Sequence, residues 1–376
     1  MKKKRVVVGL SGGVDSSVCA KLLIDQGYEV IGLFMKNWDD KDDPHCPAAV
    51  DAIDARNVAA RLGIPFYTVN FAQEYWDDVF EYFLEEHRKF RTPNPDILCN
   101  KYVKFKAFLA HAHALEADFI ATGHYAAKGW NESLKKWELQ VPHDAEKDQT
   151  YFLYAITQEA LAQTIFPLQD LPKSEVRQIA QVAGFKNANK KDSTGICFIG
   201  ERDYMEFLKK YIHQSPGDIV TEKGEIVGKH IGLSFYTLGQ RKNLNIGGVK
   251  GYDEAPWFLL EKDLENNQLV VCQEADNPKL FKSELLVSKL NWITATPSRD
   301  FEALCKVRYR QEFQRCSVKL RNLGSQELRN ESQSSQVLKL SSCQVEFQEP
   351  QRAITPGQSI VFYDLEGKVC LGGGEI

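Results

Sequence analysis

The six residues Ser11-Gly12-Gly13-Val14-Asp15-Ser16 could hold phosphate groups. The two glycines let the backbone turn sharply and approach a ligand without interference from a Cβ atom. An apolar run precedes this loop and a segment with helical spacing follows it, so the free N–H groups at the start of that helix favour an anion. A plain glycine turn with a capping Ser16 or Asp15 is the structural alternative. Because GxxxxGK[ST] and GxGxxG are absent, the loop predicts neither a Walker site nor a dinucleotide fold.

Two cysteines have neighbours that could support sulfur chemistry. Cys99 ends the stretch Asn94-Pro95-Asp96-Ile97-Leu98-Cys99, directly before a helix that we expect to begin near Lys101. A helix N-terminus lowers the pKa of a thiol, and Asp96 could accept or relay a proton. Cys197 lies in an apolar run bracketed by glycines. Either cysteine alone would more often be a small buried apolar residue, and their separation of 98 residues (197 minus 99) does not show whether they meet.

A basic segment near the carboxyl end could contact a polyanion. Residues 305–321 contain six basic residues and one acid. On a strand, Lys306, Arg308 and Arg310 would project from one face, where they could contact phosphates, and Tyr309 could stack on a base. A solvated strand face explains the pattern equally well.

Composition limits the class of protein. The 376 residues, 43% hydrophobic and 26% charged, indicate a soluble globular chain of two or three domains. A net charge of −4 excludes a uniformly basic coat, so a nucleic acid would need a local basic surface. No apolar run approaches the ~20 residues of a membrane span, and the apolar run within residues 1–10 is too short for an export signal. We therefore expect a cytoplasmic protein without membrane contact.

Metal ligands are not expected. The nine cysteines contain no CxxC pair, which argues against zinc and iron-sulfur motifs and fits a reducing compartment. The acidic residues between 39 and 43 are typical of a solvated loop. His111 and His113 are two apart on an expected helix and do not share a face.

Strand and helix patterns alternate over the first ~125 residues and predict an α/β fold with a parallel, doubly wound sheet. Ligands bind such sheets beyond the carboxyl ends of the strands. Residues 149–183 have helical spacing, with Pro172 at a helix start. The expected strands are 5–10, 28–35, 65–71 and 118–122, and the expected helices are 16–24, 47–62, 75–90 and 101–115.

Short strands and glycine turns dominate after about residue 205 and predict two small β-rich domains, the last barrel-like. The expected domains are a catalytic domain over 1–204, a central domain over 205–283 and a C-terminal domain over 284–376. The polar segment 324–335 is expected to be an exposed loop between strands of the last domain.

Taken together, these motifs resemble a known family. The loop 11–16 is similar to that of PP-loop ATP-pyrophosphatases, which include GMP, NAD and argininosuccinate synthetases. The patterns PNPDxxCNxxxKF and STGICFIGER, around Cys99 and Cys197, resemble the bacterial-type tRNA-specific 2-thiouridylases. Further ordered matches run along nearly the whole chain: 35–39, 122–125, 147–151, 238–241, 308–310, 355–358 and 371–374.

The resemblance implies thiolation of the wobble uridine of tRNA. ATP, with Mg²⁺, would adenylate the uridine 2-oxygen so that AMP can leave, and the target base would flip into a pocket. Cys197 would carry a persulfide loaded by a cysteine desulfurase or a sulfur-carrier protein. Its terminal sulfur would attack the activated carbon directly, or leave as hydrosulfide when Cys99 attacks the persulfide, and either route could end in a Cys99–Cys197 disulfide. Asp96 would be the acid/base group.

The resemblance also implies two sets of binding residues. Those for ATP are Gly9, Leu10, Ser11, Gly12, Gly13, Val14, Asp15, Ser16, Met35 and Gly123. Those for tRNA are Asn94, Pro95, Asp96, His124, Lys147, Asp148, Gln149, Arg308, Tyr309 and Gln358.

Two alternatives predict different behaviour. A small-molecule synthetase of the same superfamily would need neither Cys99 nor Cys197 and would turn over ATP without responding to tRNA. A non-catalytic tRNA-binding module with a relic nucleotide loop would bind tRNA without releasing AMP.

Overall fold

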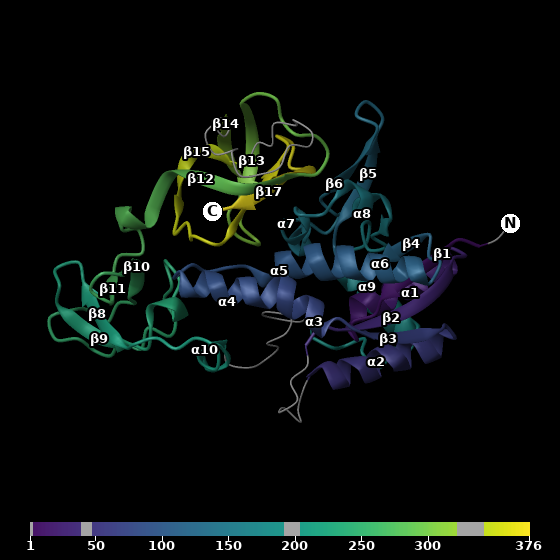
Figure 1. The fold of residues 1–376 in the computed structure, drawn as a ribbon, viewed down its shortest axis with the longest axis horizontal. Helices are drawn as coiled ribbons and strands as arrows, with labels where there is room; N and C mark the ends of the chain where they lie inside the picture. Colours follow the sequence, from purple (N-terminus) through teal and green to yellow (C-terminus); the bar gives the residue numbers. More distant parts are fainter. Residues whose placement is uncertain (1–2, 39–46, 192–203, 322–341) are drawn as a thin grey trace.

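The computed structural model describes residues 3–38, 47–191, 204–321 and 342–376. These residues form three β-sheets and the helices that pack on them (Figure 1). The α/β region contains the amino terminus, and the four-stranded sheet and the barrel lie on the side away from it.

The first sheet is the predicted parallel one, with the order β3-β2-β1-β4-β7. Every neighbouring pair in it is parallel. All predicted strands are present within one or two residues at each end, and one short strand is added. Its members are β1 (Arg5–Gly9), β2 (Glu29–Lys36), β3 (Phe66–Asn70), β4 (Phe119–Ala121) and β7 (Thr164–Ile165).

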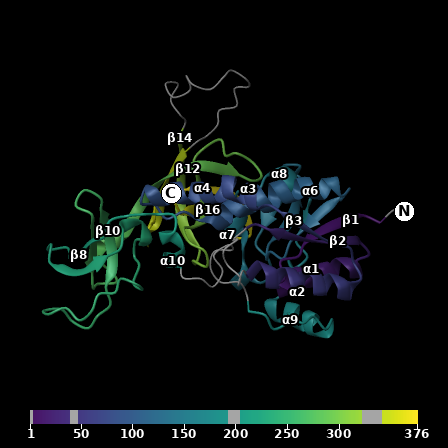
Figure 2. The same ribbon diagram turned by 60° about the horizontal axis from the view of Figure 1, so that its bottom comes forward.

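Helices cover both faces of this sheet, as the apolar strands predict. Alternate residues of β1 enter different cores, because side chains of a strand alternate between faces: Val6 and Val8 pack in one and Val7 in the other. α1 (Val14–Asp25), α2 (Pro47–Leu62) and α9 (Lys173–Val182) cover the first face (Figure 2). The second face is covered by α3 (Ala72–Tyr75), η1 (Trp76–Phe80), α4 (Glu81–Arg88) and α6 (Phe108–Ala114).

The helix expected at residue 101 begins earlier. α5 (Pro95–Leu98) continues without a break into the π-helical stretch η2 (Cys99–Ala107) and then into α6. The Asn94 side chain accepts a hydrogen bond from the Asp96 N–H and caps this helix, with Pro95 at its first position. The two prolines therefore start the helix rather than precede it.

Residues 149–183 are helical only in part. The structure has α7 (Thr150–Leu153), α8 (Gln158–Ala162) and α9, with β7 between the last two. Pro172 is the N-cap of α9, which agrees with the predicted helix start. The sequence pattern did not predict the hairpin of β5 (Ala127–Asn131) and β6 (Lys136–Gln140).

The carboxyl half is β-rich, as predicted. A four-stranded sheet has the order β10-β11-β8-β9. Its strands are β8 (Gly217–Thr221), β9 (Ile226–His230), β10 (Phe258–Asp263) and β11 (Gln268–Cys272), and the short helices of this half are α10 (Tyr204–Lys209), η4 (Leu233–Phe235) and η5 (Pro278–Leu280).

The last sheet closes into a six-stranded barrel. The order β12-β15-β14-β13-β16-β17 is completed by pairing of β12 with β17. The strands are β12 (Phe281–Trp292), β13 (Phe301–Lys306), β14 (Gln314–Arg321), β15 (Ser342–Arg352), β16 (Ser359–Tyr363) and β17 (Val369–Glu375). The predicted fold class is confirmed, and the 324–335 segment lies outside the described residues.

The hairpin of β5 and β6 ties the first region to the barrel. β6 pairs with β17 through Leu139 and Gln140, which extends the barrel sheet with residues from the amino-terminal half. Backbone pairing therefore crosses the expected domain division, and spacing along the chain does not reveal such a long-range pairing.

His87 joins α4 to the central region. Its ring is buried, its Nδ1 lies 3.2 Å from the Ser234 main-chain oxygen, and the Ser234 hydroxyl donates to the His87 main-chain oxygen. Burial, followed by the charge of Lys262, lowers the pKa of His87 to about 4. The folded protein therefore favours the neutral imidazole.

Acidification should weaken this junction. The pKa of His87 in the folded protein lies below the unfolded value of about 6.5. The contribution of His87 to the free energy of unfolding is therefore complete above pH 6.5 and is lost as the pH falls towards 4. We expect wild type to lose up to about 3 kcal/mol more unfolding free energy than His87→Gln between pH 7 and pH 4. Urea unfolding across this range measures the difference, with the exposed His143→Gln as control. Parallel pH profiles for wild type and His87→Gln would contradict the assignment.

Candidate active site

The loop 11–16 lies between β1 and α1, at the carboxyl edge of the parallel sheet. The Ser16 hydroxyl accepts a hydrogen bond from the Ser11 N–H at 3.1 Å and lies 3.2 Å from the Gly13 main-chain oxygen, to which it can donate. Ser11 is exposed and Gly13 is half-buried. The Ser16 hydroxyl therefore links the two ends of the loop on its buried side. The exposed side of the loop can receive a ligand at the start of α1.

Two glycines in this region occupy positions where a side chain would collide with backbone. Gly12 has φ +79°, and a Cβ atom there would lie 2.4 Å from the main-chain oxygen of Asp51 in α2. A Cβ atom at Gly123, just after β4, would lie 2.8 Å from the Ser16 nitrogen. The structure thus brings Gly123 against the loop that the sequence places 107 residues earlier (123 minus 16).

The remaining predicted ATP residues lie at the same edge. Gly9 ends β1, and a Cβ atom there would lie 3.1 Å from Cε of Met35 on β2. Leu10 is buried and packs in the core on the α1 side. Leu10 therefore anchors the start of the loop in the hydrophobic core.

Asp15 is held by a lysine that sequence reasoning missed. Lys173, the first residue of α9, places its Nζ 2.6 and 2.8 Å from the two carboxylate oxygens of Asp15. The Tyr125 hydroxyl donates to the same carboxylate at 3.1 Å. A lysine in the first turn of a helix is disfavoured by the helix dipole, and this unfavourable position was the available signal.

A second missed pair holds the loop from the other side. The buried Asn187 donates to the Gly12 oxygen at 2.9 Å and to the Ser17 hydroxyl at 3.0 Å. Lys190 bridges Asp51 and Asp54 of α2 at 2.7 and 2.6 Å. No local pattern marks these residues, because their partners are more than a hundred positions away.

Cys99 is buried and does not occupy a helix N-terminus. The helix begins at Pro95, so Asp96 lies in its first turn and Cys99 follows one turn later. Because the dipole effect falls off within the first turn, the prediction that it acts on Cys99 is wrong. Asp96 is half-buried, and its N–H bonds to the Asn94 side chain at 3.2 Å. Cys197 lies outside the described residues.

His124 lies between the region of the loop 11–16 and the cysteine helix, which is the continuous helix of α5, η2 and α6 that carries Cys99. Its ring centroid lies 5.8 Å from that of Phe105, six residues after Cys99 on the same helix. Its Nδ1 lies 2.8 Å from the Thr122 hydroxyl. Burial, and then the charge of Lys104, holds the pKa of His124 well below its usual value, so the ring is neutral at physiological pH.

The segment 147–149 turns its side chains mainly towards the protein. Asp148 is buried and lies 3.1 Å from Lys306 Nζ. The Gln149 side chain accepts from the Tyr125 N–H at 2.9 Å. Lys147 is half-buried in the short helix η3 (Ala145–Lys147). The Asp148 carboxylate thus forms a buried ion pair with Lys306 inside the protein.

The predicted basic strand face does not exist. β13 ends at Lys306, and the chain then turns, with Arg310 at φ +64°. Lys306 points inward to Asp148, whereas Arg308 donates to the Ala353 oxygen at 2.6 Å. The stripe prediction is wrong, because alternation between faces requires an extended strand.

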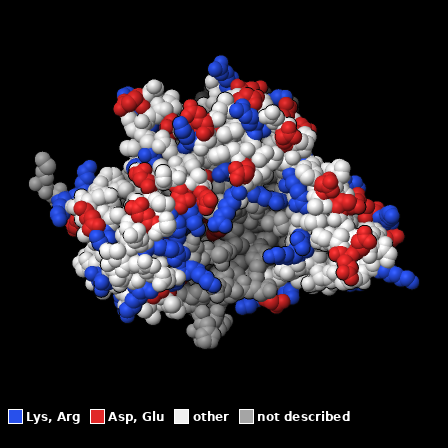
Figure 3. Space-filling view, turned by 180° about the vertical axis from the view of Figure 1, so that it is seen from behind, with Lys and Arg blue, Asp and Glu red and all other residues white. Residues whose placement is uncertain are grey.

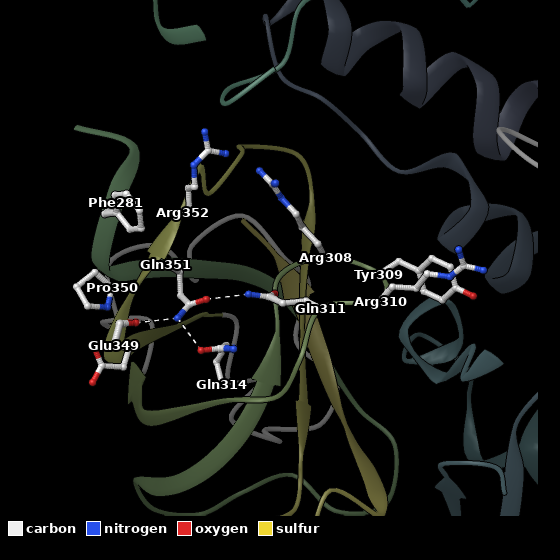
Figure 4. A pocket seen from close by; sticks show the side chains of 10 residues that line it. All are labelled: Phe281, Arg308, Tyr309, Arg310, Gln311, Gln314, Glu349, Pro350, Gln351 and Arg352. Carbon is white, nitrogen blue, oxygen red and sulfur yellow. Dashed lines mark hydrogen bonds between the residues drawn. The ribbon is translucent and has the colours of Figure 1, made fainter. Parts of the chain in front are cut away.

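The turn instead lines an open pocket of about 440 Å³ on the barrel (Figure 4). The side chains of Arg308 and Arg352 point the same way, and Tyr309 and Arg310 lie to one side of them. The Tyr309 ring packs 4.5 Å from that of Phe152, at the junction with α7. Three arginines around one pocket provide an anion-binding surface.

Gln358 lies next to the segment that leads to Asn94. Its side-chain nitrogen donates to the Thr92 oxygen at 2.6 Å, and the Thr92 N–H donates to the Pro356 oxygen at 2.8 Å. Gln358, predicted as a tRNA residue, therefore contacts the start of the cysteine helix.

Comparison with known proteins identifies the family. Family models match residues 4–201 (tRNA methyl transferase HUP domain), 205–273 (tRNA methyl transferase PRC-barrel domain), and 282–339 and 327–376 (Aminomethyltransferase beta-barrel domain). The tRNA-specific 2-thiouridylase MnmA of Hahella chejuensis is 52% identical over 377 residues, covering 100% of this chain and 98% of the relative. That of Francisella philomiragia is 51% identical over 380 residues and 100% of both chains. The chain belongs to the tRNA-specific 2-thiouridylase family.

Membership in the 2-thiouridylase family confirms the predicted family and the enzyme class, a tRNA sulfurtransferase. The PP-loop architecture implies ATP as a substrate. Lys and Arg side chains gather around a hollow on one face of the molecule (Figure 3), in spite of the net charge of −4. Such a local basic surface suits an RNA.

The described part of the chain contains neither a candidate metal site nor a candidate membrane-spanning helix. Over residues 3–38, 47–191, 204–321 and 342–376, no group of three or more His, Cys, Asp or Glu could hold a metal ion. In the same ranges, no helix has both the length and the apolar character needed to cross a membrane.

Replacing Gly12 should damage ATP use in this 2-thiouridylase. Gly12→Ala adds a Cβ that collides with Asp51 and forces the loop or α2 to move. Gly27→Ala is a matched control, because Gly27 also has positive φ (+88°) but has nothing within 4 Å. Both variants pay about 1–2 kcal/mol for the left-handed backbone. We expect only Gly12→Ala to weaken ATP binding, by about tenfold or more, corresponding to about 1.4 kcal/mol, measured by titration calorimetry. Equal losses of ATP affinity in Gly12→Ala and Gly27→Ala would contradict a specific role of the loop.

Proposed function

We propose that this enzyme adenylates the 2-oxygen of the wobble uridine of tRNA and replaces that oxygen with sulfur from a Cys197 persulfide. The observation that supports the proposal most strongly is that the loop 11–16, Gly123 and the Cys99 helix meet at one edge of the parallel sheet. The helix that carries Cys99 thus approaches the edge at which the proposed ATP loop lies, in a chain of the 2-thiouridylase family.

In the first step the uridine 2-oxygen attacks the α-phosphorus of ATP, and pyrophosphate leaves with the electrons of the broken P–O bond. Gly9–Ser16, Met35 and Gly123 would bind ATP, and the start of α1 would face its phosphates. Mg²⁺ would arrive with the nucleotide. Lys173 and Tyr125 already occupy the Asp15 carboxylate, so Asp15 would orient the loop rather than contact the phosphates.

In the second step the terminal sulfur of the Cys197 persulfide attacks carbon 2, and AMP leaves. Cys99 then attacks Sγ of Cys197, the S–S bond to the uridine sulfur breaks, and the base departs as 2-thiouridine. The two cysteines end as a disulfide, so an external thiol must reduce it before the next turnover. A cysteine desulfurase or sulfur-carrier protein would reload Cys197.

Asp96 would exchange protons with the uridine and the leaving groups. Its half-buried side chain lies in the first turn of the cysteine helix, where the Asn94 cap fixes the backbone. Asn94 and Pro95 would line the flipped base. A helix N-terminus also favours the ionised carboxylate, which suits a group that accepts a proton.

The tRNA would contact both the barrel and the α/β region, which we propose as separate domains with boundaries near 204 and 283. Arg308 and Tyr309, beside the pocket of Figure 4, would contact its backbone and a base. His124, Lys147, Gln149 and Gln358 would complete the surface nearer the active site.

The test supplies purified enzyme with ATP, Mg²⁺, a persulfide donor and tRNA, and quantifies AMP and 2-thiouridine after digestion of the RNA. We expect Cys99→Ser and Cys197→Ser to abolish 2-thiouridine and to retain tRNA-dependent release of pyrophosphate, measured in the same reactions, because they leave the ATP site and the adenylation step intact. Asp96→Asn should reduce thiolation by about 10²- to 10⁴-fold, the usual contribution of acid/base catalysis. Cys272→Ala, which removes a buried thiol from β11, is the control.

Three outcomes would contradict the proposal. Thiolation that survives Cys197→Ser would exclude the persulfide role. ATP turnover that ignores tRNA and needs neither cysteine would favour a small-molecule synthetase. Binding of tRNA without any AMP would favour a non-catalytic module.

A further inference from the structure

The short segment Phe90–Thr92 joins α4 to the cysteine helix, and both β-rich regions hold it. Lys262 of β10 donates to the Phe90 oxygen at 2.8 Å. On the barrel side, the Thr92 N–H donates to the Pro356 oxygen, and the Thr92 oxygen accepts from the Gln358 side chain. Phe90 itself has φ +61°. The path of this segment is therefore set by residues that lie far away in the sequence.

Arg91 adds an ionic contact with the barrel. Its Nη2 lies 2.9 Å from Oε1 of Glu375, at the end of β17, and donates to the Ile376 main-chain oxygen at 2.8 Å. Its Nε lies 3.0 Å from Oε2 of Glu86 on α4. The Glu86 side chain is 2% exposed and that of Glu375 12% exposed. One guanidinium thus links two largely buried carboxylates from different parts of the fold.

The second oxygen of Glu375 is also occupied. Tyr82 of α4 donates to Oε2 at 2.5 Å, and Lys289 of β12 lies 3.0 Å from it. Lys289 is 58% exposed and has no contact with Phe90–Thr92 among the described interactions. The carboxylate of Glu375 therefore has a partly buried arm, through Arg91, which is 32% exposed, and an exposed arm, through Lys289.

Only Pro93 separates this segment from Asn94, the cap of the cysteine helix. A shift of Arg91 or Thr92 would move the start of that helix, on which Asp96 and Cys99 lie. Acid/base and nucleophilic groups need placement within a fraction of an ångström, and an error of about 1 Å can cost about 10²-fold in rate.

We propose that Arg91 and Glu375 are positioning residues for the thiolation reaction: their ion pair fixes Asp96 and Cys99 relative to the barrel that holds the tRNA. This inference rests on the proposed function. A buried ion pair seldom adds net stability compared with apolar residues, but it does select one geometry when removal of a partner leaves a buried charge. The Arg91–Glu375 pair is partly buried, with side chains 32% and 12% exposed, and Glu86 places a second carboxylate 3.0 Å from the same guanidinium.

The test measures steady-state thiolation (kcat and the KM for ATP) and tRNA binding in parallel for Glu375→Gln and Glu375→Ala. We expect Glu375→Ala to lower kcat by about 10- to 100-fold and Glu375→Gln, which keeps an acceptor for Arg91, by less. The Kd for tRNA and the KM for ATP should not change, because neither substrate touches this pair. Lys289→Met is the matched control: it removes the exposed arm of Glu375 and should keep wild-type kcat.

Several results would overturn the inference. A rise in the Kd for tRNA that accounts for the whole loss would make Glu375 part of the RNA contact. A loss that follows the fall in melting temperature and recovers on cooling would show a role in stability alone, as would equal effects of Glu375→Ala and Lys289→Met. Failure of the proposed function looks different, since the wild-type enzyme itself would then form no 2-thiouridine.

Discussion

The buried ion pair of Asp148 and Lys306 is the contact on which the position of the barrel depends. Their side chains are 3% and 11% exposed and lie 3.1 Å apart. Buried charges are tolerated only when they are paired and hydrogen-bonded, and Asp148 also accepts from the Thr150 hydroxyl at 2.6 Å. Beside them, the Tyr151 hydroxyl donates to the Ser359 oxygen at 2.9 Å. A shift of the barrel at this seam would separate these paired groups, so the contacts favour the observed arrangement.

In this arrangement the loop 11–16 and the arginine-lined pocket of the barrel lie in different regions of the fold, joined through the helix that carries Cys99. The loop 11–16 lies at the sheet edge, and the barrel, with its arginine-lined pocket, lies over α4 and α5 (Figure 1). Between them, Phe90–Thr92 is bonded to the barrel and to the four-stranded sheet. The barrel and the helix that carries Cys99 are thus connected through few residues. Lys173 makes a similar long-range connection, because it lies on α9 and forms an ion pair with Asp15 of the loop 11–16.

Sequence patterns were sufficient wherever local rules decide the structure. Continuous apolar strands and the glycine loop predicted the parallel sheet and its ligand edge, because burial on both faces and close backbone approach need those residue types. Two of the errors concern the ends of elements. The helix starts early, with a cap at Asn94, which places Cys99 beyond its first turn. The strand that a basic stripe required ends at Lys306, and the chain then turns. The hydrophobic periodicity of a sequence does not identify the residue at which a helix starts or a strand ends.

The sequence by itself therefore determined the family, the fold class and the enzyme class, since the loop 11–16 and two cysteines in specific contexts match few families. The tertiary structure alone decided how those residues are held. Lys173 and Asn187 support the phosphate loop across 158 and 170 positions, and Glu375 reaches Arg91 across 284. The physical reason is that hydrogen bonds and ion pairs depend on distance in space, and chain folding brings together groups whose spacing in sequence carries no periodic signal.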